Sequence, residues 1–125
     1  MEGTRVGKMS RTTGAAAERE LFKLLSDELG FVVRRNVDQA RAGGADGVEV
    51  PGIAIEVKRR EALSIPAWWR QTCKQAQDSK RLPILFYRQS RKPWSVVIPK
   101  TIEDWSEVRT DFQEGMKWIR ENMTA

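Results

Sequence analysis

The stretch at residues 52–58, Gly-Ile-Ala-Ile-Glu-Val-Lys, constrains the fold of this chain more than any other feature. Successive side chains in a β-strand point to opposite faces, so its three branched aliphatic residues share one face. The other face carries Glu56 and Lys58, which the usual rise along a strand separates by about 7 Å. The pattern predicts a strand with one face in the core and an ion pair on the other. An edge strand whose ion pair is solvated is the alternative interpretation.

The charge balance and the histidine content limit the kinds of function. Lys and Arg outnumber Asp and Glu by 22 to 17, which gives a net charge of +5. Such a surface favours polyanions, nucleic acid first, because binding releases counterions. The chain has no histidine, which excludes Ser-His-Asp and Cys-His hydrolases, His-dependent zinc sites and nucleases with a histidine base. Any hydrolysis would therefore depend on carboxylates and lysine, and carboxylates select hard ions such as Mg²⁺ or Mn²⁺.

Length and residue usage predict one domain over residues 1–125. The chain is long enough for one modest core and too short for two. No apolar run is long enough to span a membrane, and the N-terminus has no apolar secretory segment. The single cysteine, Cys73, cannot form an intrachain disulfide. We therefore expect a protein of the reducing cytoplasm.

The first expected element is a helix. Residues 1–11 are basic and lack periodicity, and we predict a flexible basic arm there. Thr12 or Thr13 can cap a helix that runs to about Leu29 and stops at Gly30. Its core-facing side is predicted from an apolar stripe, which consists of Leu21, Phe22, Leu25 and Leu29.

Glu18 falls on the axis of this apolar stripe at 100° per residue, whereas Arg19 falls on the solvated side. A carboxylate in this position has two explanations. It interacts favourably with the helix dipole or with exposed backbone, or it reaches into a metal site as a ligand. The sequence leaves both open.

A polar, glycine-bearing segment separates the first helix from the strand that carries Glu56. Residues 31–35 predict a short strand, and residues 46–50 predict a second one. Between them, residues 37–44 predict a loop in which Arg41 can lie along a phosphate backbone.

The register of the second strand decides where Asp46 points. A three-residue loop over residues 50–52 places Asp46 opposite Glu56 on the same face. A two-residue turn instead pairs Asp46 with Val57, although a bulge near Gly47 would restore the first alignment. The sequence does not choose between these alternatives.

Helix and strand signals continue in the second half of the chain. A helix is predicted from the Ser64 cap to about Lys80, and strands are predicted at residues 82–87 and 94–98. Apolar residues at helical spacing over residues 101–125 predict one long helix or two helices with a break near Thr110 or Gly115.

Gln71 and Gln75 lie one turn apart on the helix expected before residue 80, and both are close to Lys74. At least one of these glutamines is expected to be ordinary polar helix surface.

Four short motifs in order resemble the PD-(D/E)XK nuclease superfamily, and most closely its archaeal-type Holliday junction resolvases and their phage relatives. The motifs are Gly14-x-x-x-Glu18-Arg19-Glu20-Leu21, Gly30-Phe31-Val32-Val33-Arg34, Gly43-Gly44-Ala45-Asp46 and Ile55-Glu56-Val57-Lys58. Beyond them only the order of helices and strands matches, and Ala45 replaces the proline of the superfamily name. The resemblance implies an α/β fold with a restriction-endonuclease-like αβββαβ core, a mixed sheet flanked by helices, and here a C-terminal helical extension.

The resemblance also implies roles for individual residues. Asp46 and Glu56 would be the main metal ligands, and Glu18 would complete the site or order a water molecule at the metal. Lys58 would orient the nucleophilic water or stabilise charge on the phosphate. Gln71 or Gln75 would stand where many superfamily members place a helix glutamine that faces the site. The implied or candidate DNA contacts are Arg19, Arg34, Arg41, Gln71, Gln75 and Lys74.

These features together predict a Mg²⁺-dependent DNA endonuclease that resolves Holliday (four-way) junctions in DNA recombination or repair, with Mn²⁺ as a possible substitute. A homodimer is expected because cutting two opposed strands requires two active sites. Two alternatives stay open: another superfamily nuclease that acts on flaps, mismatches or replication intermediates, and a non-catalytic nucleic-acid-binding module.

Overall fold

The computed structural model describes the backbone of residues 2–33 and 50–124 and the side chains of residues 15–33 and 50–124. The described helices and strands belong to one α/β unit, in which three strands follow one another after α3. In chain order they are α1 (Glu2–Leu29), β1 (Ile53–Arg59), α3 (Ile65–Ser79), β2 (Leu82–Arg88), β3 (Ser95–Pro99), β4 (Glu107–Asp111) and α4 (Phe112–Asn122).

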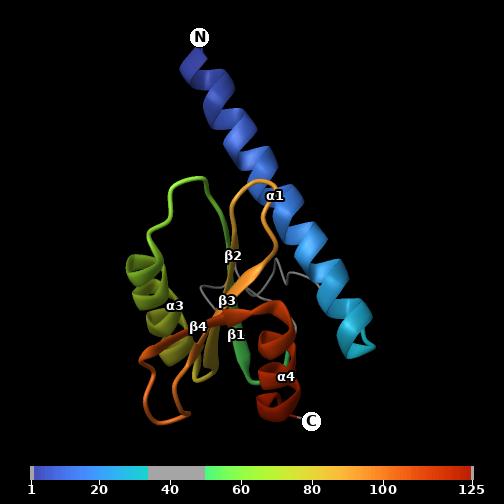
Figure 1. The fold of residues 1–125 in the computed structure, drawn as a ribbon, viewed down its shortest axis with the longest axis vertical. Coiled ribbons are helices and arrows are strands. Elements are labelled where there is room, and N and C mark those ends of the chain that lie inside the picture. Colours follow the sequence, from blue (N-terminus) through green and yellow to red (C-terminus); the bar gives the residue numbers. More distant parts are fainter. Residues whose placement is uncertain (1, 34–49, 125) are drawn as a thin grey trace.

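The described strands form a mixed sheet in the order β1-β2-β3-β4 (Figure 1). β1 and β2 are parallel, and α3 makes the crossover connection that a parallel pair requires. β2 pairs with β3, and β3 with β4, in antiparallel fashion. The predicted α/β fold with a mixed sheet flanked by helices is confirmed.

Helices cover both faces of this sheet, and two apolar clusters show which helix lies on which face. The larger cluster joins α1 and α4 to Ile53, Ile55 and Ile84 of the sheet. The smaller cluster joins Ile65 and Trp69 of α3 to the opposite face of the sheet. The three branched residues of β1 therefore face α1 and α4, as the period of two predicts.

α1 ends where the sequence predicts and begins earlier. Gly30 has a φ of +81° and donates its backbone N–H to the carbonyl of Ser26, which is the usual glycine stop. The helix starts at Glu2, so Thr12 and Thr13 lie inside it and do not cap it. The backbone of residues 2–11, within the predicted flexible basic arm, is helical.

The connection after α1 is only partly described. Residues 31–33 have no regular secondary structure, so the strand predicted from Phe31 does not begin there. The backbone N–H of Val33 donates to the hydroxyl of Ser26 at 2.8 Å, and Val33 is 3% exposed. Most of the two strands predicted over residues 31–50 lies outside the described residues.

The turn into β1 is a tight one. The backbone N–H of Ile53 donates to the carbonyl of Val50 at 3.1 Å, with Pro51 and Gly52 between them. Gly52 has a φ of +80°, which a type II turn requires at its third position and which glycine adopts without a Cβ penalty. The structure therefore has the two-residue turn. Asp46 itself lies outside the described residues.

The C-terminal segment corrects a sequence prediction. Residues 107–111 form strand β4, which pairs with β3, and only residues 112–122 form a helix. Asp111 ends the strand and caps the helix, because its carboxylate accepts the backbone N–H of Glu114 at 2.9 Å. Apolar spacing over five residues does not separate a strand from a helix, which explains the error.

α3 begins at Ile65 as predicted, but the Ser64 side chain makes no capping hydrogen bond. No helix in the described ranges is both long enough and apolar enough to cross a membrane.

Candidate active site

Glu56 and Lys58 lie together near the carboxyl end of β1. Lys58 Nζ is 3.7 Å from Glu56 Oε1, and their side chains are only 16% and 11% exposed. Their partners in the parallel register are Tyr87 and Leu85, which pack on the α3 side of the sheet. The ion pair is therefore sheltered between β1 and α3, and the prediction of a charged face opposite the core face of β1 is confirmed.

This burial has a chemical consequence. A carboxylate held away from water costs free energy unless a cation balances it, and one lysine balances one carboxylate. Carboxylate oxygen is the ligand that Mg²⁺ and Mn²⁺ prefer. Lys58 balances Glu56 alone, so any further carboxylate brought to this face would be best balanced by a hard divalent ion.

Glu18 is half-buried on α1, at the margin of the apolar stripe rather than on its axis. Ala17 and Leu21, at 3% and 0% exposure, mark the axis instead. α1 packs on the face of β1 that carries Ile53, whereas Glu56 points to the other face. A site shared by the two carboxylates would therefore form around the outer edge of β1, the terminal strand of the described sheet.

Three expected site residues, Asp46, Arg34 and Arg41, lie outside the described residues. Within the described ranges, no three Cys, Asp or Glu side chains are grouped so as to hold a metal ion. The expected metal site would draw on Asp46 as well as on Glu56 and Glu18.

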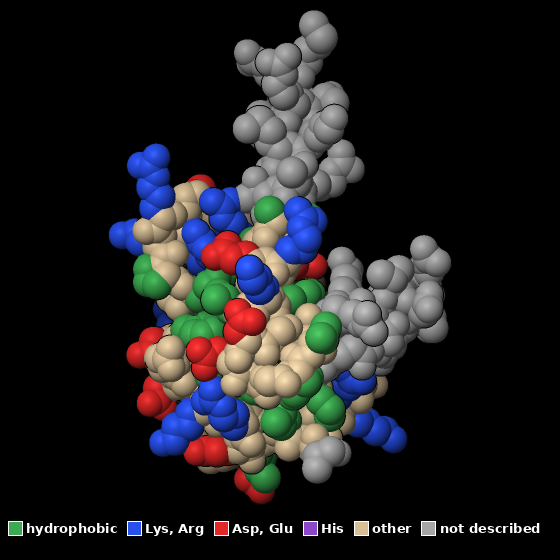
Figure 2. All heavy atoms as spheres, turned by 90° about the vertical axis from the view of Figure 1, so that its right-hand side faces the viewer, with side chains coloured by type: hydrophobic (Ala, Val, Ile, Leu, Met, Phe, Trp, Pro, Cys, Tyr) green, Lys and Arg blue, Asp and Glu red, His purple; other side chains and the backbone are tan. Residues whose placement is uncertain are grey.

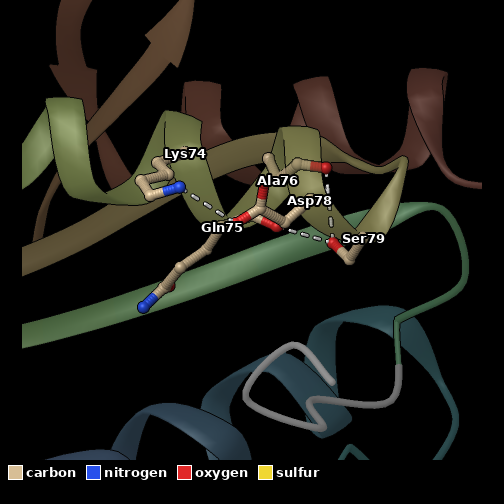
Figure 3. Close-up of polar contacts among 5 residues, drawn as sticks. All are labelled: Lys74, Gln75, Ala76, Asp78 and Ser79. Atoms are coloured by element: carbon tan, nitrogen blue, oxygen red, sulfur yellow. Dashed lines mark hydrogen bonds and ion pairs between the residues drawn. The ribbon is translucent and has the colours of Figure 1, made fainter. Parts of the chain in front are cut away.

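On α3, Gln75 is half-buried while Gln71 and Lys74 are exposed. In Figure 3 the Gln75 side chain extends from α3 toward β1, the green strand. Lys74 lies on the outer surface, where its ammonium pairs with Asp78 one turn away at 3.4 Å (Figure 3). Of the two glutamines, Gln75 is therefore the one whose side chain lies on the β1 side of α3.

Cys73 is half-buried near the same face of α3. Burial raises the pKa of its thiol to about 11, which keeps the thiol protonated at neutral pH. Cys73 is therefore suited to packing and not to nucleophilic or metal-binding chemistry.

Arg88 is a charged residue on the α1 side of the sheet whose contacts sequence reasoning missed. It ends β2 beside Arg59, and its guanidinium donates to Glu20 of α1 at 2.7 Å. The same guanidinium lies 5.5 Å from the ring centroid of Trp94. It fixes α1 against the end of the sheet, whereas Arg19, the neighbouring candidate on α1, is exposed. In the sequence, the signal for Arg88 was a basic residue directly after a strongly apolar stretch that predicts a buried strand.

Comparison with known proteins gives two matches. A family model described as "Phage putative PDDEXK endonuclease" matches residues 9–124. Among solved structures, that of Hjc from Archaeoglobus fulgidus, described as a Holliday junction resolvase from an archaeal hyperthermophile, is similar at 19% sequence identity. That likeness covers 90% of each chain, with a TM-score of 0.46. No curated protein matches the chain.

Proposed function

Because the chain belongs to the phage PDDEXK endonuclease family, we propose that it is a Mg²⁺-dependent DNA endonuclease that cuts four-way junctions. The observation that carries the proposal is the sheltered Glu56–Lys58 pair at the end of β1, with 3.7 Å between the charged groups. The choice of four-way junctions is supported by the four resolvase-like motifs over residues 14–58.

In this proposal Glu56 and Asp46 hold the divalent ion, and Glu18 completes the site. The ion would supply charge neutralisation at the scissile phosphate and a more acidic water. Lys58 stands beside Glu56, where its ammonium orients the attacking water or stabilises charge on a phosphate oxygen.

Contacts to the DNA are assigned to residues around this pair. Gln75 extends from α3 toward β1, so its amide would bond to the phosphate or sugar near the cut. Arg19, Arg34 and Arg41 would neutralise the DNA backbone, with Gln71 and Lys74 farther from the cut. Two copies of the chain would act together, because symmetric cutting of a junction needs two active sites.

The deciding experiment compares three synthetic substrates, a four-way junction, a flap and a linear duplex, with Mg²⁺, Mn²⁺ or EDTA. We expect paired symmetric nicks in the junction with either metal, little cutting of duplex, and none in EDTA. Equal cutting of junction and duplex would remove junction selectivity. Preferred cutting of the flap would favour a different substrate class within the same family.

A second experiment tests the site itself. Asp46→Asn is expected to abolish cleavage while it keeps junction binding, because it removes a ligand charge without a change of shape. The matched control is Asp78→Asn, since the Asp78 side chain is 67% exposed and pairs with Lys74 on the outer surface of α3. Full activity of Asp46→Asn would exclude the proposed site.

A further inference from the structure

Two loops leave the same end of the sheet and are hydrogen-bonded to each other. Because β1 and β2 are parallel, with Arg59 opposite Arg88, their carboxyl ends lie side by side. Figure 1 shows the loop after β1 and the loop between β2 and β3 together at that end of the molecule. In open α/β sheets, ligands bind beyond the carboxyl ends of the strands.

Glu61 is the residue that joins these loops. Its carboxylate accepts hydrogen bonds from both the backbone N–H and the hydroxyl of Ser90, the first at 3.1 Å. Its backbone carbonyl accepts from the side-chain amide of Gln89 at 2.7 Å. Arg59 donates to the Ser90 hydroxyl at 2.9 Å. We call these hydrogen bonds the Glu61 clamp. They join residues that are 28 to 31 positions apart in sequence, and the first of these residues, Arg59, directly follows Lys58.

The joined loops are strongly basic. Residues 59–62 and 88–92 hold five basic side chains and one acid, Glu61, whose carboxylate is engaged by Ser90. Figure 2 shows several Lys and Arg side chains at the upper end of the described molecule, with some Asp and Glu side chains among them. Arg59 donates to Ser90 and Arg88 pairs with Glu20, so the exposed basic side chains of the two loops are Arg60, Arg91 and Lys92.

Arg91 stands at the tip of the second loop in an unusual conformation. The backbone N–H of Lys92 donates to the carbonyl of Gln89 at 3.2 Å, which closes a turn with Arg91 at its third position. Arg91 has a φ of +62°, where glycine or asparagine is the usual choice. Backbone strain of this kind is concentrated at functional sites, and here it presents an exposed guanidinium.

We propose that these clamped loops form a phosphate-binding platform, on which Arg60, Arg91 and Lys92 hold the DNA strand that leaves the Glu56–Lys58 site. Glu61 is a positioning residue that fixes the second loop against the first. The inference deepens the proposed endonuclease function and rests on it, because the polyanion on the platform is the DNA being cut.

The first test replaces Arg91 by glycine, which removes the charge from a backbone position that glycine accepts. Lys80→Gly is the matched control, because Lys80 also has a positive φ, +57°, and lies before β2 at the opposite end of the sheet. Binding of a synthetic four-way junction is measured in EDTA over a range of salt concentrations. We expect Arg91→Gly to weaken binding about 5–10-fold at 0.1 M salt and to reduce the salt slope by about 1. An equal loss of junction affinity in Arg91→Gly and Lys80→Gly would contradict the proposed platform.

The second test separates positioning from simple attraction. Glu61→Ala removes a negative charge from the proposed DNA face, so charge alone predicts tighter junction binding. If Glu61 positions the loop, the variant binds several-fold more weakly despite the more favourable charge. Glu121→Ala, on the exposed surface of α4, is the charge-matched control and should bind slightly more tightly or equally. Equal or tighter binding by Glu61→Ala would overturn the positioning role.

The platform and the endonuclease proposal can fail separately. If the wild type cuts junctions and Arg91→Gly binds them normally, the platform is wrong and the endonuclease stands. If Arg91→Gly binds poorly but Asp46→Asn still cuts, the platform stands and the catalytic site is wrong. If the wild type binds no DNA, both are wrong.

Discussion

Lys58 Nζ lies 3.7 Å from Glu56 Oε1, on a strand that buries both residues against α3. Each charged group is costly away from water, and each reduces the cost of the other. The pair is thus preorganised before any substrate arrives. Its carboxylate is suited to a metal ion and its ammonium to a phosphate oxygen.

Glu56→Gln and Lys58→Met should each reduce single-turnover junction cleavage by about 10²–10³-fold, the usual loss when one electrostatic group of an active site is removed. Both variants should still bind the junction, because the contacts to the DNA backbone that we propose come mostly from other residues. Quenched-flow cleavage with enzyme in excess and a binding titration in EDTA separate the two effects.

The double variant tests whether the two residues act as one unit. Residues that act together are strongly non-additive, so Glu56→Gln with Lys58→Met should be about as slow as the slower single variant. If the two losses instead multiply, Glu56 and Lys58 act independently.

Several elements were predictable because their signals are local. The alternation in β1 assigned Glu56 and Lys58 to the face opposite the core, and Gly30 marked the end of α1. α3, β2 and β3 also follow from short apolar patterns, within a residue or two at their ends.

Other features depend on contacts distant in sequence. Residues 107–111 become a strand because β3 offers a free edge, which no local pattern reveals. Arg88 and Glu20 are 68 residues apart, and Glu61 and Ser90 are 29 residues apart. The sequence alone does not predict which distant residue a charged side chain will pair with. The choice of a two-residue turn at Pro51 was open because proline and glycine suit several turn types.

Gly115 sets how closely α4 approaches β3. A Cβ at this position would lie 2.9 Å from Cγ2 of Val96, whose side chain is fully buried. Overpacking typically costs about 1–3 kcal/mol, more than the roughly 1 kcal/mol that alanine gains over glycine in a helix. Gly115→Ala should therefore lower the free energy of urea unfolding in the wild type. In a Val96→Ala background the same change should raise it, and a decrease in both backgrounds would contradict the contact.

Arg91 and Lys80 share a positive φ, so glycine should be tolerated at both positions. A left-handed conformation costs a residue with a Cβ about 1–2 kcal/mol, and glycine loses about 0.5–1 kcal/mol through its freer unfolded chain. Each glycine variant should therefore keep or raise the free energy of unfolding by up to about 1 kcal/mol. A clear loss of stability in chemical denaturation would show that the side chain makes a structural contact.

The Glu61 clamp should respond to acid in a defined direction. Hydrogen bonds from Ser90 hold the pKa of the Glu61 carboxyl below its ordinary value of 4.5. A carboxyl with a lowered pKa contributes fully above that ordinary value, and its contribution is lost as the pH falls through the lowered pKa. The Ser90 amide resonance should therefore stay constant from neutral pH down to about 4.5 and shift only below it. In Glu61→Ala this inflection should be absent. An inflection above 4.5, or one that survives the substitution, would show that another group controls the loop.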